Sequence, residues 1–145
     1  MKKDGDLRTI FRHQLKSWQW STIEVGVIAG GIPDSEFCSY LGAQGWIEFK
    51  FTKIYYVQIK PLQVAWLMRR CRYGGNAWIA VRRMPSAKRY SDVDELWLMK
   101  GSQAEALLKH GLEGVHALMW SGGPSNWNFD QISKVLQGIV PICNP

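Results

Sequence analysis

The sequence is poor in the residues that build disulfide frameworks and zinc sites. Its three cysteines, Cys38, Cys71 and Cys143, are scattered without Cys-x-x-Cys spacing, and its three histidines are equally dispersed. We therefore expect free or buried thiols in a reducing compartment and no metal centre built on histidine. No apolar run reaches the length of a membrane span, and the N-terminus lacks the apolar stretch of a signal peptide. These absences predict a cytoplasmic protein with no membrane partner.

Acidic residues are missing from one long interval of the chain. Between Glu48 and Asp92 there is none, and the basic residues that fall there are Lys50, Lys53, Lys60, Arg69, Arg70, Arg72, Arg82, Arg83, Lys88 and Arg89. From Asp92 onward the balance reverses, although the net charge of the whole chain is +6. A basic block of this kind suits a polyanion such as DNA, and an ordinary solvated face is the alternative.

What the sequence does contain is enough apolar material for one folded domain. It has 145 residues, of which 46% are hydrophobic, and eight tryptophans. We expect Trp46, Trp66, Trp78 and Trp97 to belong to the core. Trp120 and Trp127 lie on either side of a Gly-Gly-Pro turn, where they could cover an edge of the core or bind a partner.

The hydrophobic pattern predicts an α/β fold, with residues 1–100 as its core and 101–145 as a C-terminal helical extension packed on the same domain. The first three strands should form an antiparallel meander, and the fourth should run parallel to the third through the second helix. The expected helices are 6–18, from Pro61 to Gly74, 102–109 and 129–136, and the expected strands are 20–29, 35–41, 45–51, 77–81 and 95–99.

The candidate site lies on the second and third of these strands. Asp34 follows Pro33, and after thirteen intervening residues come Glu48 and Lys50, which gives the pattern P-D-x13-E-x-K. Because strand side chains alternate, Glu48 and Lys50 should project from one face, and pairing of the two strands would bring Asp34 beside them. Two converging carboxylates favour a divalent cation, and a lysine beside them can orient water or stabilise a phosphate. A turn aspartate and a surface ion pair are the alternatives.

This pattern resembles the signature of the PD-(D/E)xK nuclease superfamily. The wider run, over roughly residues 20–83, is similar to the VRR-NUC branch, related to Holliday-junction resolvases, and in particular to its small stand-alone versions encoded by bacteriophages. The residues that carry this likeness are Gly31–Asp34, Gly45–Lys50, Pro61–Leu67 and Gly74–Arg82. The resemblance implies a restriction-endonuclease-like αβββαβ core with a mixed central sheet flanked by helices.

The resemblance also implies roles for particular residues. Asp34, Glu48 and the backbone carbonyl of Phe49 would hold Mg²⁺ or Mn²⁺, and Lys50 and Gln63 would complete the catalytic set. Relatives commonly supply a further acid from the first helix, where residues 11–18 have none. Glu24 or Asp6 could replace it, and Glu36 is a weaker candidate.

The function that follows is metal-dependent hydrolysis of DNA by an endonuclease. We expect selectivity for branched DNA such as Holliday junctions, action as a homodimer, and a host-cell cytoplasmic location if the protein is encoded by a phage. A nicking or restriction-like endonuclease is one alternative, and a non-catalytic DNA-binding accessory protein is another. The residues expected to grip phosphates are Lys53, Lys60, Arg69, Arg70, Arg82 and Arg83.

Overall fold

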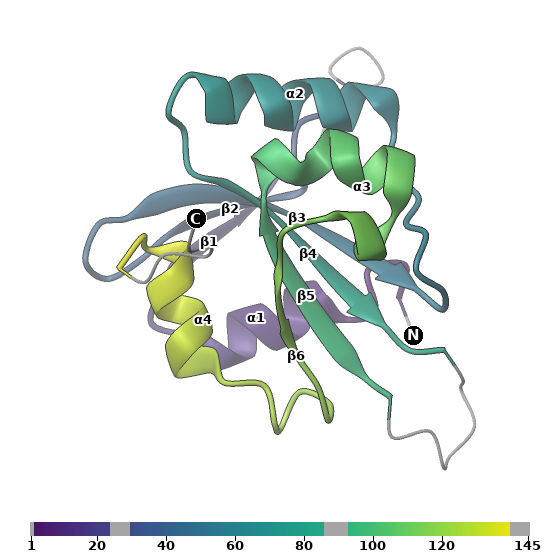
Figure 1. The fold of residues 1–145 in the computed structure, drawn as a ribbon. Coiled ribbons are helices and arrows are strands. Elements are labelled where there is room, and N and C mark those ends of the chain that lie inside the picture. The colour runs from purple at the N-terminus through teal and green to yellow at the C-terminus, as the bar shows by residue number, and fades with distance from the viewer. Residues whose placement is uncertain (1, 24–29, 86–92, 140–145) are drawn as a thin grey trace.

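The computed structural model describes residues 2–23, 30–85 and 93–139, which form a six-stranded mixed sheet with helices on both faces (Figure 1). The order of the strands in the sheet is their order along the chain. Among the described strands β3 and β4 pair in parallel and all other neighbours are antiparallel. The strands are β1 (Gln19–Thr22), β2 (Ser35–Cys38), β3 (Gln44–Thr52), β4 (Ala77–Arg83), β5 (Glu95–Lys100) and β6 (Leu118–Trp120).

The four α-helices found in the described ranges divide between the two faces of the sheet. In Figure 1, α2 (Pro61–Arg72) and α3 (Ala104–His110) lie above the sheet, and α1 (Leu7–Gln14) and α4 (Phe129–Leu136) lie below it. Two short 3₁₀ helices, η1 (Gly101–Gln103) and η2 (Leu112–Gly114), flank α3. The predicted order of helix, three strands, helix and strand is confirmed, and so is an α/β fold with a mixed sheet flanked by helices.

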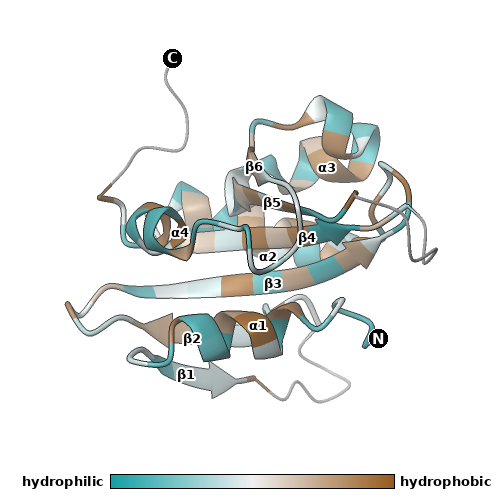
Figure 2. Cartoon of the chain, turned by 90° about the horizontal axis from the view of Figure 1, so that it is seen from below, coloured by the Kyte–Doolittle hydropathy of each residue, from teal (hydrophilic) through white to brown (hydrophobic). Residues whose placement is uncertain are grey.

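Side-chain alternation along β3 separates the core from the candidate site. Ile47 and Phe49 face α1, where the Phe49 ring packs edge-on against Phe11 with the ring centroids 5.1 Å apart. Glu48 and Lys50 project from the other face, beneath α2. The alternation is visible in Figure 2 as successive brown and teal segments along β3. The apolar half of the strand fixes its register, and the polar half is thereby aimed at the first turn of α2.

The C-terminal part is more than the helical extension that the sequence predicted. It supplies β6 as an edge strand, and α4 packs into the same apolar cluster as α1. Phe129 meets Phe11 edge-on at 5.2 Å between ring centroids, and Trp127 is buried in the same cluster. These two aromatic residues therefore cover the core. Trp46, Trp66 and Trp97 are partly buried and, with the fully buried Trp78, belong to or pack against the core as expected.

Two elements end at least three residues earlier than expected, and the other differences in the described boundaries are smaller. The first helix ends at Gln14 instead of residue 18, and β2 ends at Cys38 instead of residue 41. The strand expected over 20–29 is seen as β1 up to Thr22, and its remainder falls largely outside the described residues. No helix in the described ranges is both long and apolar enough to cross a lipid bilayer.

Candidate active site

The candidate site forms where β2 begins beside β3. Ser35 is opposite Ile47 in the antiparallel register, so Asp34 comes to lie beside Glu48. The backbone N–H of Asp34 donates a hydrogen bond to Oε2 of Glu48 at 3.1 Å. Because β2 starts only at Ser35 while β3 continues to Thr52, no described strand pairs with the second half of β3 on this side. The predicted meeting of the two carboxylates is therefore present in the structure.

Glu48 is held by a second set of contacts from α2. The side-chain amide of Gln63 donates to Oε1 of Glu48 at 2.9 Å, and its carbonyl oxygen accepts from Nζ of Lys50 at 3.0 Å. The same carbonyl oxygen accepts from the backbone N–H of Lys60 at 3.0 Å, which ties the network to the first turn of the helix. The Lys50 ammonium lies 3.5 Å from Oε1 of Glu48. One glutamine thus fixes the positions of both charged side chains.

A close backbone approach sets the distance between the Asp34 loop and this helix. Gly31 has a positive φ of 101°, and a Cβ atom built on it would collide with the backbone carbonyl of Leu62. The residue next to Leu62 is Gln63, whose side chain reaches Glu48. Glycine at position 31 therefore lets the segment that leads to Asp34 pack directly on the helix that carries Gln63.

The two carboxylates are costly to ionise together. Burial, and then the nearby charge of Glu48, raise the pKa of Asp34 from 3.8 to about 7, against an opposing effect of Arg8. Burial also raises the pKa of Glu48, which is only 5% exposed, although Lys50 works in the opposite direction. Oδ1 of Asp34 is buried and accepts no hydrogen bond from any residue that the structure describes. A buried acceptor without a donor, beside a second carboxylate, fits a cation with a preference for oxygen ligands.

The oxygen donors for such a cation are Asp34, Glu48 and the backbone of Phe49. All three residues line one hollow of about 310 Å³. The Phe49 ring is packed on the opposite face of the sheet, which is consistent with a contribution from its backbone. In the described ranges no three His, Cys, Asp or Glu residues are grouped for metal binding.

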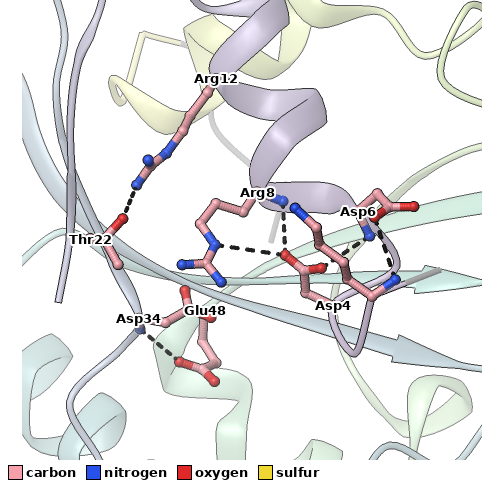
Figure 3. Close-up of polar contacts among 8 residues, drawn as sticks. Asp4, Asp6, Arg8, Arg12, Thr22, Asp34 and Glu48 are labelled. Carbon is pink, nitrogen blue, oxygen red and sulfur yellow. Dashed lines mark hydrogen bonds and ion pairs between the residues drawn. The ribbon is translucent and has the colours of Figure 1, made fainter. Parts of the chain in front are cut away.

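Two of the further acids considered from the sequence, Asp6 and Glu36, do not line the hollow that holds this pair. Glu24 lies outside the described residues. Asp6 accepts a hydrogen bond from the backbone of Lys2 at 3.4 Å, and Figure 3 shows it beyond Asp4, away from the carboxylate pair. Glu36 accepts a hydrogen bond from Gln44 at 3.4 Å.

The acid that does approach the site is one that the sequence analysis missed. Asp4 is 7% exposed and lines the same hollow as Asp34 and Glu48. Its carboxylate accepts from the backbone N–H groups of Asp6 at 3.0 Å and Arg8 at 3.1 Å, so Asp4 holds the first turn of α1. The signal that could have found it is the N-terminal run Lys2-Lys3-Asp4, which places charges directly before the first helix.

A larger hollow continues from the site along the start of α2. It has a volume of about 710 Å³ and shares Lys3 and Lys50 with the smaller one. Its described lining combines ammonium groups, two glutamine amides and apolar surface, with no carboxylate among these residues. The lining residues are Lys3, Lys50, Phe51, Gln58, Ile59, Lys60, Pro61 and Gln63.

The structure contradicts the expectation that Arg82 and Arg83 bind DNA phosphates. Both are only 8% exposed. Arg82 forms two hydrogen bonds with Asp94, at 2.8 and 2.7 Å, and Arg83 bonds Glu95 at 2.7 Å. The acids are distant in sequence but adjacent in space, because β5 runs antiparallel to β4 with Arg83 opposite Glu95. These guanidinium groups already have carboxylate partners, so we assign them a structural role.

The other basic residues expected to contact DNA remain at the surface to different degrees. Lys53, Lys60 and Arg69 are exposed, and Lys60 lines the larger hollow. Arg70 is half-buried, with its guanidinium 4.5 Å from the Trp66 ring centroid. The Arg69 guanidinium lies 5.7 Å from the ring centroid of Tyr73, the residue that follows the last one of α2. Both arginines are on the C-terminal half of α2, away from its first turn, which carries Gln63.

Comparisons of the chain with family models, curated proteins and solved structures gave no match.

Proposed function

We propose that the chain is a metal-dependent DNA endonuclease whose active site is formed by Asp34, Glu48, Lys50 and Gln63. The observation that carries the proposal is the contact between the backbone of Asp34 and the carboxylate of Glu48, with Lys50 and Gln63 bonded into the same cluster. Burying two carboxylates and a lysine costs free energy that apolar residues would not cost. A site that uses those charges accounts for their position.

The cation for which this site is suited is Mg²⁺ or Mn²⁺, held by Asp34, Glu48 and the Phe49 carbonyl. When bound, such an ion neutralises phosphate charge and lowers the pKa of a water ligand. Lys50 would donate from Nζ to the attacking water or to a phosphate oxygen, because its ammonium is held at 3.0 Å from the Gln63 carbonyl oxygen and borders both hollows. Gln63 would keep Lys50 and Glu48 apart at a fixed distance during the reaction.

The substrate strand would follow the two hollows. The scissile phosphate would lie in the smaller one, above the carboxylates, and the adjoining backbone would run into the larger one. Lys3 and Lys60 line this larger hollow and would meet flanking phosphates, with Lys53 and Arg69 as more distant contacts. Such contacts would set affinity and register without reading the base sequence.

The experiment that tests the proposal is a cleavage panel. Four-way junction, flap, plain duplex and single-stranded DNA are incubated with the protein in Mg²⁺, Mn²⁺ or EDTA. Cleavage of DNA should require the metal and should be lost in Asp34→Ala, Glu48→Ala and Lys50→Ala, while all three variants stay folded and bind DNA. Full cleavage by the Glu48→Ala protein, or metal-dependent activity in none of the reactions, would refute the proposal.

The preference for branched DNA is supported by the resemblance to stand-alone VRR-NUC proteins. A junction resolvase must cut two strands, and one chain with one carboxylate pair offers a single site, so this substrate calls for a two-fold homodimer. Paired nicks in opposing arms of a four-way junction, with a dimer in light scattering, are the expected results. A monomer that nicks plain duplex equally well would favour the nicking or restriction-like alternative.

A further inference from the structure

One cationic side chain at the site has no role in the function proposed above. Arg8, in the first turn of α1, lines the smaller hollow together with Asp34 and Glu48. Figure 3 shows its side chain extending from the helix toward these two carboxylates. Its side chain is 37% exposed. It therefore approaches the carboxylate pair from α1, whereas Lys50 comes from β3.

The donors of this guanidinium are largely free of contacts with the residues that the structure describes. Its one ionic contact among the described residues is with Asp4, whose Oδ2 lies 4.0 Å from Nε of Arg8. No hydrogen bond joins the guanidinium to another described residue, although the backbone N–H of Arg8 donates to the same Oδ2 at 3.1 Å. An arginine carries five N–H donors in a planar fork that matches the oxygens of a phosphate.

The position of Arg8 is fixed from the far side of the N-terminal turn. Asp4 anchors the start of α1, and the next residue, Gly5, has a φ of 65° that suits glycine. Nη1 of Arg82 donates to the Gly5 carbonyl oxygen at 2.7 Å, while Nε and Nη2 of Arg82 bind Asp94. The buried Arg82–Asp94 pair thus holds the turn that precedes Arg8. This anchoring gives the buried Arg82 a structural role.

We propose that Arg8 is a catalytic residue whose guanidinium contacts the non-bridging oxygens of the scissile phosphate, and that Asp4 is its positioning residue. This inference rests on the proposed nuclease function. The negative charge on those oxygens changes as the phosphorus is attacked, and a fixed guanidinium donor stabilises it in the transition state. Lys50 would serve the attacking side of the same phosphate.

The chain offers a matched control on the same helix. Arg12 follows Arg8 by one turn, and its guanidinium donates to the Thr22 hydroxyl at 2.7 Å, as Figure 3 shows. Replacing either arginine with alanine removes one positive charge from α1. A loss of activity that depends only on net charge, or on the stability of α1, would appear in both variants.

The test is single-turnover cleavage of the best DNA substrate at saturating protein, with the Kd for that DNA measured separately in Ca²⁺. Arg8→Ala should lower the cleavage rate constant about 100-fold and weaken binding less than about threefold, because the contact is made chiefly in the transition state. Arg8→Lys should lose about tenfold, since an ammonium keeps the charge without the fork. Arg12→Ala should stay within about twofold of the wild-type protein in both measurements.

A second readout separates contact with the phosphate from a structural role. Guanidinium ions at millimolar concentration should restore part of the activity of Arg8→Ala but not of Asp4→Asn, which keeps the arginine and loses its anchor. Equal rate constants for Arg8→Ala and Arg12→Ala would overturn this inference and leave the nuclease intact. Absence of cleavage by the wild-type protein would overturn both.

Discussion

The raised pKa of Asp34 predicts that this carboxylate destabilises the metal-free protein at neutral and higher pH. Its pKa is about 7 in the folded protein, compared with an ordinary value of 3.8. The folded state therefore binds the proton more tightly than the unfolded chain, and the free energy of unfolding falls as the pH rises between these two values. Asp34→Asn removes the titrating group, so the variant should gain stability over the wild-type protein as the pH increases.

The size of the effect follows from the same values. The whole difference in pKa corresponds to at most about 4 kcal/mol, at 1.36 kcal/mol per pKa unit. Between pH 5 and pH 8 roughly two thirds of it should develop, and screening at a partly exposed carboxylate reduces this to about 1.5 kcal/mol. The free energy of unfolding is expected to fall by about 1.5 kcal/mol per molar urea. The difference between the urea midpoints of Asp34→Asn and the wild-type protein should therefore increase by about 1 M from pH 5 to pH 8.

Urea unfolding in EDTA at pH 5 and pH 8, followed by circular dichroism, measures this difference. The matched control is Glu36→Gln, which makes the same change of charge two residues away, where the side chain accepts a hydrogen bond from Gln44. A similar gain with pH in the control would mean that net charge is responsible. An advantage of Asp34→Asn that does not change between pH 5 and pH 8 would refute the reasoning.

Three further outcomes follow from contacts around the site. Gln63→Leu should lower the cleavage rate constant about 10-fold with little change in DNA affinity, because both charged partners lose their shared amide; unchanged single-turnover rates would contradict this. Gly31→Ala should cost about 2 kcal/mol of stability or more and also reduce metal-dependent activity. Gly42 has a φ of 85° but open space around its Cβ position, so Gly42→Ala should show only the cost of backbone strain and keep the activity. Asp94→Asn leaves the buried Arg82 without a full counter-charge, so thermal unfolding should report a loss of about 3 kcal/mol.

The parts of the structure that could be predicted from sequence are those set by local periodicity. Alternation along 45–51 placed Glu48 and Lys50 on one face, and the structure has them there because Ile47 and Phe49 are buried on the other. Proline at the start of α2 placed Gln63 in the first turn of that helix, within reach of β3. These expectations needed only the period of a strand and the start of a helix.

The parts that could not be predicted depend on pairings across long sequence distances. The acid-free interval suggested a continuous basic face, but Arg82 and Arg83 meet acids of the next strand across the sheet. The three-residue β6 is too short to give an alternating pattern, and its place at the edge depends on pairing with β5. Arg8 could not be assigned to the site because its approach depends on a hydrogen bond from Arg82 to Gly5, 77 residues away in the chain.

The sequential order of the strands also bears on how the protein folds during synthesis. Each strand pairs with its predecessor in the chain, so the sheet can grow by adding one strand at a time, with a single crossover between β3 and β4. Residues 31–63, which hold the carboxylate cluster, are contiguous and precede β4 in the chain, so they leave the ribosome before β4 does. The turn that carries Arg8 is translated first, but it is anchored by Arg82 and Asp94, which come later. We therefore expect a growing chain to assemble the carboxylates first and to dock the arginine only once β5 has joined the sheet.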